Sequence, residues 1–547
     1  MMKRLGLESA LLAGLVACSR SSSPPSDAGA TAEVQILSLS TWLGQLDPVA
    51  IDDDAGVSHQ YGGLAALATY FKSDRAASPN TIVVLDANSW GASPPLASQF
   101  ADVPAVKGLA YLGADVDMLS NHNFDDGIPY LQNLVGVSGY PYVASNLTGV
   151  QTTVSPKVAT PFQIVVAGPV SVGIVAITDP SAPSKTLPGN FGGITLAEPI
   201  AATNAAARAA RAAGAHVVVA ITDLQTLGLS AGGAHVGPLI DFAGAVEGVD
   251  VVFGYNQTAP GTPTVGKVLV VEHTWKGETY GRTRLQVKDG VLQTASATVV
   301  VPDAAAVTPD PGAVALLAPY RAQLAHVFDG LVATADGLLA VDGTERVAEV
   351  ALGDFVAGAF LAKYASLGAQ IAVTNGAALR DSLPSSYAPA NKSLRRPATG
   401  YAAGPPYDVV VGDVYTVLPF GDFCVLRPIT GATLWLMLEQ SVSMEPDANN
   451  GFLQIAGFTF TYSLGAPVGA RVQSVTLDDG TSVARGDATT IQLVDTDYLD
   501  EGGDDYGMLV ESPPAPLRDV DAKVVLDYLE THPEITAAPA GRITQMP

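Results

Sequence analysis

Short apolar runs alternate with longer Ala-rich segments through the first half of the chain. Five apolar runs end in polar clusters, at 35–39, 81–85, 165–177, 216–221 and 249–253. Between these runs lie segments such as 199–213, which is rich in Ala, contains Arg residues and has the composition of a helix. Strands that alternate with helices predict an α/β layered fold. In such sheets the polar residues that follow the strand ends form the site, so candidate chemistry is expected there.

The pattern changes near residue 301. Prolines punctuate the chain from 302 to 311, and a segment that is apolar at helical spacing follows at 313–328. This arrangement is typical of a connection between domains. The second half resumes with a predicted helix at 347–364 and predicted strands at 371–374, 408–411, 452–462 and 491–496. A length of 547 residues also favours at least two domains over one.

Composition and charge narrow the class of protein. Hydrophobic residues make up 48% of the chain and charged residues only 15%, which excludes a largely disordered protein. The 53 acidic side chains exceed the 28 basic ones and give a net charge of −25. Such a chain repels phosphate backbones, so nucleic acid is not an expected partner.

The first residues predict export. Lys3 and Arg4 precede an apolar stretch at 9–17, and Cys18 follows directly. This resembles a bacterial lipoprotein signal, in which Cys18 is lipidated and becomes the mature N-terminus. The alternative is an ordinary cleaved signal with a cysteine there by chance. Residues 19–32, rich in Pro and Ser, then predict a flexible tether to the outer membrane, on its periplasmic or cell-surface face.

Only two cysteines exist, Cys18 and Cys424. Lipidation of Cys18 leaves no intramolecular disulfide, and Cys424, inside the apolar run Phe-Cys-Val-Leu, is expected to be a core thiol rather than a nucleophile.

Several motifs of the second half occur in a specific order. Residues 375–380 read Asn-Gly-Ala-Ala-Leu-Arg, 412–421 form a segment expected to be extended and closed by Pro and Gly, and 497–504 read Asp-Tyr-Leu-Asp-Glu-Gly-Gly-Asp. Together with 451–454 and 541–544, they resemble the C-terminal substrate-binding domain of the 5′-nucleotidase family. That family is an exported, two-domain group that includes nucleotide phosphatases and UDP-sugar hydrolases.

The resemblance implies a role for each of five residues. Phe452 and Tyr498 would sandwich the nucleobase, Arg380 would hold phosphate, and Asn375 and Asp504 would make polar contacts. Aromatic faces stack on any base, and a guanidinium fork matches phosphate oxygens. Asp504, as an anion, would face the sugar or base rather than phosphate. A nucleoside or nucleotide is therefore the expected small-molecule partner.

Simpler interpretations remain open for these residues. Taken singly, Phe452 and Tyr498 suit a hydrophobic core, and Arg380 suits a surface ion pair with Asp381. The family's Asn-Gly-Gly-Gly-Ile-Arg run is Asn-Gly-Ala-Ala-Leu-Arg here, so two Cβ atoms are added where the backbone would approach a ligand.

By the same resemblance, the first half is a calcineurin-like metallophosphoesterase domain, a β-sandwich flanked by helices with two divalent ions at successive strand ends. Such a centre needs carboxylate or imidazole ligands at nearly every position. Five of the expected ligand positions carry other groups. The replacements are Thr41 for Asp, Leu43 for His, Ser89 for the bridging Asp, and Asn256 and Thr258 for two His.

Three residues of the expected metal site keep useful chemistry. Asn121 would be a retained ligand, and Asp223 replaces a His by a carboxylate that can still bind a divalent ion. His122 would be the catalytic residue that stabilises charge on the transferring phosphate, although local hydrogen bonding is an equal alternative for Asn121 and His122. Trp42 and Trp90, next to vacated positions, would fill the space that the ions and water would occupy.

The sequence therefore supports one leading hypothesis and two others. The leading one is a lipid-anchored 5′-nucleotidase homologue that binds nucleosides or nucleotides, with weak or absent phosphatase activity and no certain cofactor. The second is an active enzyme that uses divalent ions on a non-standard ligand set, and the third is a surface scaffold without ligand or activity.

The expected segments are a signal peptide at 1–18, a tether at 19–32, a metallophosphoesterase-like domain at 33–300, a linker and connecting helix at 301–332, and a nucleotidase C-terminal domain at 333–547.

Overall fold

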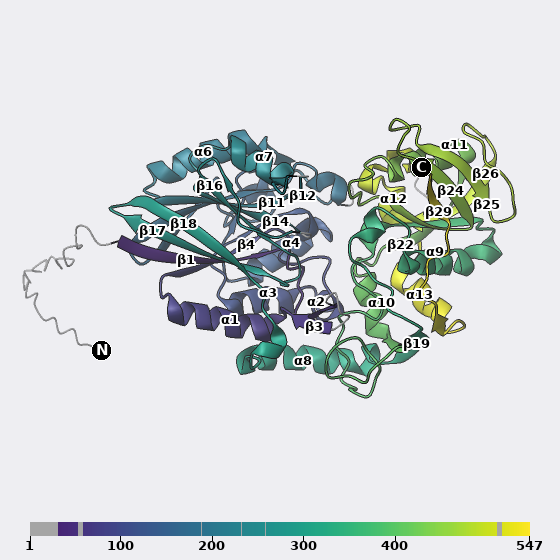
Figure 1. Ribbon diagram of the computed structural model, residues 1–547, viewed down its shortest axis with the longest axis horizontal. Coiled ribbons are helices and arrows are strands. Elements are labelled where there is room, and N and C mark those ends of the chain that lie inside the picture. The colour runs from purple at the N-terminus through teal and green to yellow at the C-terminus, as the bar shows by residue number, and fades with distance from the viewer. Residues whose placement is uncertain are drawn as a thin grey trace, which may run out of the picture.

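A computed structural model describes residues 31–52, 58–186, 189–230, 232–256, 259–510 and 517–546. Cys18, the predicted signal peptide and most of the predicted tether lie outside the described residues. Figure 1 shows two lobes, with the first half of the chain in purple to teal and the second in green to yellow. Within the described ranges, no helix has the length and apolar character needed to cross a membrane.

The first lobe is a sandwich of two β-sheets. One has the strand order β18-β17-β1-β4 and the other the order β15-β16-β14-β11-β9-β8. The strands are β1 Thr31–Ser40, β4 Thr81–Asp86, β8 Gln163–Ala167, β9 Val170–Ile177, β11 Val217–Gln225, β14 Val251–Tyr255, β15 Thr264–Val265, β16 Val268–His273, β17 Tyr280–Lys288 and β18 Val291–Val300. Val34 and Val84 of the first sheet meet Ile174 and Val219 of the second in one buried cluster, so the space between the sheets is a hydrophobic core.

Helices cover both outer faces of the sandwich (Figure 1). The first sheet is covered by α1 (Leu64–Ala77), α3 (Val103–Leu112) and α4 (Gly127–Val137), and the second by α6 (Pro199–Ala212) and α7 (Pro238–Ala245). The predicted α/β layers are therefore confirmed. The shorter elements here are β2 Val49–Asp52, β3 Ser58–Tyr61, α2 Pro95–Ser98, β5 Asp117–Met118, η1 Asn121–Phe124, β6 Tyr142–Val143, β7 Leu147–Thr148, α5 Val150–Thr153, η2 Ala182–Lys185, β10 Thr195–Leu196, β12 Gly228–Leu229, β13 His235–Val236 and η3 Ala304–Ala306.

A long helix, α8 (Pro311–Phe328), follows the proline-rich stretch and runs along the lower side of the first lobe in Figure 1. Its Leu317 and Leu324 are buried in the same cluster as Leu64 and Leu109. Arg321 forms an ion pair with Asp47 of the first lobe. The connecting helix is thus packed firmly on that lobe.

The second lobe is built on a five-stranded sheet with the order β23-β20-β26-β22-β27. Helices α9 and α13 pack on one face of this sheet and α11 on the other. Its elements are β19 Leu331–Ala335, η4 Thr344–Arg346, α9 Ala351–Tyr364, η5 Ala365–Leu367, β20 Ile371–Asn375, η6 Gly376–Ala378, β21 Tyr407–Val410, α10 Val411–Val417, β22 Phe423–Thr430, α11 Gly431–Ser441, β23 Leu453–Ala456, β24 Phe458–Ser463, β25 Val472–Leu477, β26 Thr490–Thr496, α12 Asp497–Asp500, η7 Gly503–Asp505, η8 Gly507–Leu509, β27 Leu517–Val520, α13 Asp521–Leu529, β28 Glu534–Ile535 and β29 Ile543–Met546.

Two local predictions in this lobe are wrong. The run 452–462 is not one strand, because Gly457 turns the chain with a φ of 87° and a Cβ there would lie 2.2 Å from the carbonyl oxygen of Gln370. The segment 412–421 is not extended, since α10 occupies most of it. The Asp413 carboxylate accepts the backbone N–H of Val410 at 2.8 Å and so stabilises the start of this helix.

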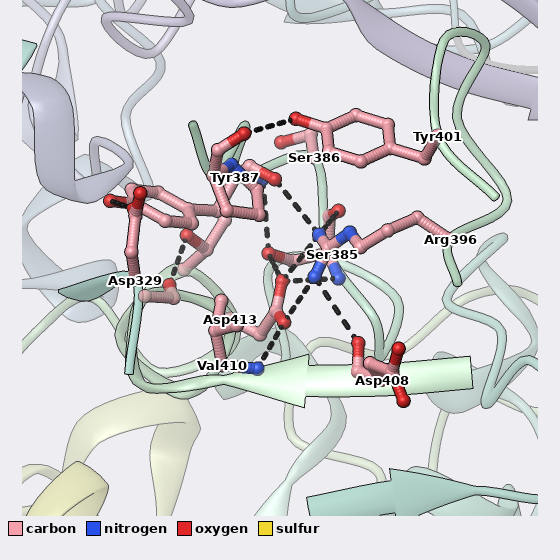
Figure 2. A network of polar contacts seen from close by, with 12 residues as sticks. Asp329, Ser385, Ser386, Tyr387, Arg396, Tyr401, Asp408, Val410 and Asp413 are labelled. Carbon is pink, nitrogen blue, oxygen red and sulfur yellow. Dashed lines mark hydrogen bonds and ion pairs between the residues drawn. The ribbon is translucent and has the colours of Figure 1, made fainter. Parts of the chain in front are cut away.

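The same carboxylate anchors a long irregular segment, 379–406, that joins η6 to β21. Figure 2 shows Arg396 and Asp413 in a two-pronged ion pair, with N–O distances of 2.6 and 2.7 Å, and both side chains are almost fully buried. Asp413 also accepts the hydroxyl of Ser385 at 2.7 Å. The neighbouring Ser386 accepts a hydrogen bond of 3.2 Å from Gln45, so the segment connects the second lobe to the first.

Candidate functional site

A cavity of about 600 Å³ lies between the two lobes and receives side chains from both. From the first lobe it is lined by residues that follow strand ends or lie on short helices, among them Thr41, Asn88, Asn121, His122, Asp125, Lys185, Asp223, Tyr255 and Trp275. From the second it is lined by Arg346, Asn375, Arg380, Phe420, Phe423, Asp497, Tyr498 and Asp504, among others. The polar positions at strand ends therefore do meet at one place, as the alternating pattern predicts.

Three of the predicted substrate-binding residues form one hydrogen-bonded group in this cavity. The Tyr498 hydroxyl donates to one oxygen of Asp504 at 3.1 Å, and the Asn375 amide donates to the other at 2.8 Å. Burial raises the pKa of Asp504 above its usual value. The oxygen of the Asn375 side chain is buried and has no hydrogen-bond partner. The group thus presents an unused acceptor and a fixed aromatic ring to a ligand.

Phe452 is not part of this wall, and the predicted Phe452–Tyr498 sandwich is wrong. Phe452 is 0% exposed and packs in the core cluster of the second lobe. Two other phenylalanines of the second lobe line the cavity, Phe420 and the 37% exposed Phe423. One oxygen of Asp497 accepts the backbone N–H of Phe423 at 2.9 Å and that of Tyr498 at 3.1 Å, which fixes the two residues relative to each other.

Arg380 lies in the cavity and not on the surface. Its guanidinium carbon is 5.8 Å from the centre of the Trp275 ring and 5.7 Å from that of Phe420. Burial and the charge of Arg346 lower the pKa of Arg380 to about 10, so it stays charged at neutral pH. The alternative ion pair with Asp381 does not form within the part of the chain that the structure describes, because Asp381 instead accepts hydrogen bonds from the backbone and side chains of nearby serines.

Two further cations of the cavity were missed by the sequence analysis. Arg346 enters from the end of η4, with its Nε 3.5 Å from an oxygen of Glu345. Lys185 enters from the end of η2 and pairs with Asp179 at 3.0 Å. Neither belongs to a recognisable motif, since each reaches the cavity only through the arrangement of the two lobes.

His122 and Asn121 occupy the cavity wall of the first lobe. The Nδ1 of His122 lies 2.7 Å from Asp125, and its ring stacks on Phe420 of the second lobe at a centroid distance of 5.8 Å. Burial, together with the charges of Arg380 and Lys185, lowers the pKa of His122 well below its usual value, so it is neutral at neutral pH. The oxygen of the Asn121 side chain accepts a hydrogen bond of 3.1 Å from the Asn88 amide.

Ser89 does not face the cavity. Its hydroxyl donates to the buried carboxyl of Asp117 at 2.6 Å, away from Asn121, and it is Asn88 that lines the cavity in its place. The expected position of the bridging carboxylate is therefore filled by a neutral amide. Asn88 also accepts hydrogen bonds from Ser120 and from the backbone N–H of His122, so its oxygen is fully engaged.

Two of the other replaced positions, Leu43 and Asn256, are buried and do not line the cavity. Leu43 is buried at 1% exposure, and Thr41 has a φ of 45°, which is rare for a β-branched residue. Asn256 is fully buried and donates to the carbonyl of Ala259 and to Glu272. Thr258 lies outside the described residues.

Asp223 is the one carboxylate at an expected ligand position. One of its oxygens accepts the backbone N–H of Asp179, and the other is buried without a partner. Burial raises the pKa of Asp223 well above its usual value, which a nearby divalent ion would oppose. Among the described residues no group of three His, Cys, Asp or Glu side chains could hold a metal ion. The residues present do not fit a two-metal centre.

Trp42 and Trp90 do not fill the vacated site. Both are fully buried in the helix-covered core of the first lobe, and Trp90 donates to the Tyr142 hydroxyl at 3.1 Å. The tryptophan that lines the cavity is Trp275, beside Arg380. The site is therefore an open polar cavity and not a tryptophan-filled one.

A Ser–His–Asp arrangement lies nearby, but it is sealed in the core. Ser38 lies 2.6 Å from Nε2 of His273, whose Nδ1 is 3.6 Å from Asp86. All three side chains are 0% exposed, so no substrate reaches them. Cys424 is likewise fully buried, and burial raises the pKa of its thiol well above its usual value.

Comparison with known protein families identifies the domain that forms the second lobe. The family described as the 5′-nucleotidase C-terminal domain matches residues 331–511. This segment is a 5′-nucleotidase C-terminal domain. The 5′-nucleotidase precursor from Thermus thermophilus has the same two-domain fold, with a TM-score of 0.81 and 22% sequence identity over 94% of this chain and 99% of that one. The predicted family resemblance is confirmed, and so is the predicted fold class of two α/β domains, the first a β-sandwich flanked by helices.

Two curated relatives show a similar level of sequence identity to this chain. Endonuclease YhcR of Bacillus subtilis is 24% identical over 539 residues, which cover 93% of this chain and 41% of that protein. Cell wall protein Lmo0130 of Listeria monocytogenes is 24% identical over 572 residues, which cover 94% of this chain and 69% of that protein. The chain thus spans less than half the length of YhcR. Its ancestry is that of the nucleotide phosphoester hydrolases.

Proposed function

We propose that this protein binds a nucleoside or nucleotide in the cavity between its two domains and has weak or no phosphatase activity. A contrast between the two walls of the cavity supports this proposal. The wall from the second domain carries aromatic rings, hydrogen-bonding groups and guanidinium groups that suit a nucleotide, whereas the described residues of the first domain lack the cluster of carboxylates and imidazoles that a two-metal centre needs.

The charges of the cavity orient the ligand. Asp504 repels phosphate and accepts from hydroxyl groups, so the ribose or base lies against Asp504 and Asn375. The base would stack between Tyr498 and Phe423, at roughly 1–3 kcal/mol per aromatic face. The phosphate would then lie toward Arg380, whose Nε is buried without a hydrogen-bond partner.

Loss of activity follows from the chemistry of the remaining groups. His122, neutral and held by Asp125, can accept or donate a proton, but the described residues offer no cluster of ligands for an ion that would lower the pKa of an attacking water. The competing proposal, an active nucleotidase that uses Asn121, Asp223 and further ligands, requires an ion held mainly by neutral oxygens. Such oxygens bind divalent transition metals more weakly than imidazole does.

We also propose export and anchoring through Cys18 at the outer membrane. The likeness to a cell wall protein of Listeria monocytogenes supports export, and the lipoprotein signal supports the anchor. The proposed domains are 33–300 and 333–547, joined by 301–332, which contains α8.

Thermal unfolding in the presence of nucleosides tests the proposal. Adenosine, guanosine, uridine and cytidine are added in turn, and at least one should raise the melting temperature by several degrees. The shift should be lost in Tyr498→Ala and kept in Tyr528→Ala, a tyrosine of α13 outside the cavity. Absence of any shift in the wild-type protein, with nucleosides and with their monophosphates, would show that the cavity is not a nucleotide site and would favour the scaffold hypothesis.

A further inference from the structure

Lys185 is the cation of the cavity that comes from the first domain. It ends η2, and its side chain is 32% exposed. η2 packs against η1, which carries Asn121 and His122, and also against η7, which carries Asp504. The ammonium therefore lies between the remnants of the metal site and the part of the cavity assigned to the nucleoside.

Asp223 positions this lysine indirectly. It accepts the backbone N–H of Asp179, and Asp179 in turn pairs with Lys185 at 3.0 Å and accepts the N–H of Ser181 at 2.8 Å. The carboxylate at an expected metal-ligand position thus fixes the loop that brings an ammonium into the cavity.

Three positive groups converge on the same place. Arg346 and Arg380 enter from the second domain and Lys185 from the first, and all three line the cavity. Arg380 and His122 both lie against the Phe420 ring, whose centre is 5.7 Å from the guanidinium carbon and 5.8 Å from the centre of the His122 ring. Within the described residues, the Arg380 guanidinium donates to the carbonyl of Ala377 and forms no ion pair with a carboxylate, so its charge is available to a ligand.

We propose that the Lys185 ammonium takes the electrostatic place of the absent divalent ions, so that the cavity binds the phosphate of a nucleoside monophosphate without a metal. This inference rests on the proposed function. A phosphomonoester carries a charge of about −1.5 to −2 at neutral pH and offers three acceptor oxygens. One ammonium and two guanidinium groups match that charge and geometry.

The same substitution accounts for binding without turnover. An ammonium supplies charge and hydrogen-bond donors, but it is not a Lewis acid and does not convert a bound water into hydroxide. The phosphate ester is therefore held and not hydrolysed.

Calorimetric titration tests the inference. AMP, GMP, UMP and CMP are screened, and the tightest ligand and its parent nucleoside are then titrated into the full-length protein with EDTA or with Mn²⁺. The monophosphate should bind equally well in both buffers. Lys185→Met should weaken monophosphate binding about tenfold or more, because one charge-assisted contact is lost. Lys185→Arg, which keeps the charge, should restore most of the affinity.

Two controls separate the outcomes. The nucleoside should bind Lys185→Met as tightly as it binds the wild type, and this result would also show that the variant is folded. The substitution of an exposed lysine, Lys157→Met, should change neither the affinity for the monophosphate nor that for the nucleoside. Loss of monophosphate binding in EDTA, or unchanged monophosphate binding in Lys185→Met, would overturn the role of Lys185 while nucleoside binding stands. Absence of binding by both ligands to the wild type would overturn the proposed function and this inference together.

Discussion

Ser89 donates a hydrogen bond of 2.6 Å to Asp117, and this contact turns its side chain into the core and away from the cavity. The place beside Asn121 is taken by Asn88, whose amide is already engaged by its neighbours. Hydrogen bonds among neighbouring side chains therefore occupy the positions at which the family resemblance predicts metal contacts.

The buried carboxyl of Asp117 predicts a pH dependence of stability. Burial raises the pKa of Asp117 to about 8 in the folded protein, whereas a carboxyl in an unfolded chain titrates near about 4. Its contribution to stability is therefore fully present below about pH 4 and is lost as the pH rises toward about 8. In Asp117→Asn the group is uncharged throughout, so the free energy of unfolding should fall less between about pH 5 and pH 8 than in the wild type.

Urea denaturation at the two pH values measures this difference. Asp479→Asn is the control, because that exposed carboxyl has a lowered pKa and is ionised in both states above about pH 5. Equal pH dependence in the wild type and Asp117→Asn would contradict the assignment of a protonated Asp117.

Phe423 and Phe452 should respond in opposite ways to truncation. Phe423→Ala should weaken nucleoside binding by about 1–3 kcal/mol with little change in melting temperature, because the ring lines the cavity. Phe452→Ala should instead destabilise the fold by about 3–5 kcal/mol, because the ring is fully buried. Titration with the nucleoside and chemical denaturation measure the two effects. A specific loss of affinity in Phe452→Ala at unchanged stability would restore the sandwich predicted from the sequence.

The Arg396–Asp413 pair should be essential to the second domain. Asp413→Ala leaves a buried guanidinium without its carboxylate, and we expect a destabilisation of about 3–5 kcal/mol. The exposed pair Arg542–Asp478 provides the control, and Asp478→Ala should cost less than about 1 kcal/mol. Chemical denaturation compares the variants, and similar costs for both would show that the segment 379–406 is held by other contacts.

Sequence patterns were sufficient for the architecture and for part of the site. Alternating apolar runs predict the α/β layers, and the resemblance to the 5′-nucleotidase family predicts Asn375, Arg380, Tyr498 and Asp504, all of which line one cavity. These predictions succeed because each motif is local, and the ends of neighbouring strands meet at one edge of a sheet.

The errors have a different origin. The predicted role of Phe452 failed because the sequence does not show which face of a strand end points into the core. Arg346 and Lys185 were missed because neither lies in a motif, and each reaches the cavity only through the arrangement of the two domains. Asn88 was overlooked because hydrogen bonds with Ser120 and Asn121, and not chain position, decide which neighbour faces the cavity.

Metal content and turnover, measured on the same sample, test the central claim most directly. The full-length protein is dialysed against Mn²⁺, Zn²⁺ or Mg²⁺, passed over a desalting column and analysed for bound metal, while phosphate release from AMP is followed in each buffer. We expect well below one ion per chain and no release above a His122→Ala control. Two ions bound per chain, with dephosphorylation that His122→Ala abolishes, would contradict the account.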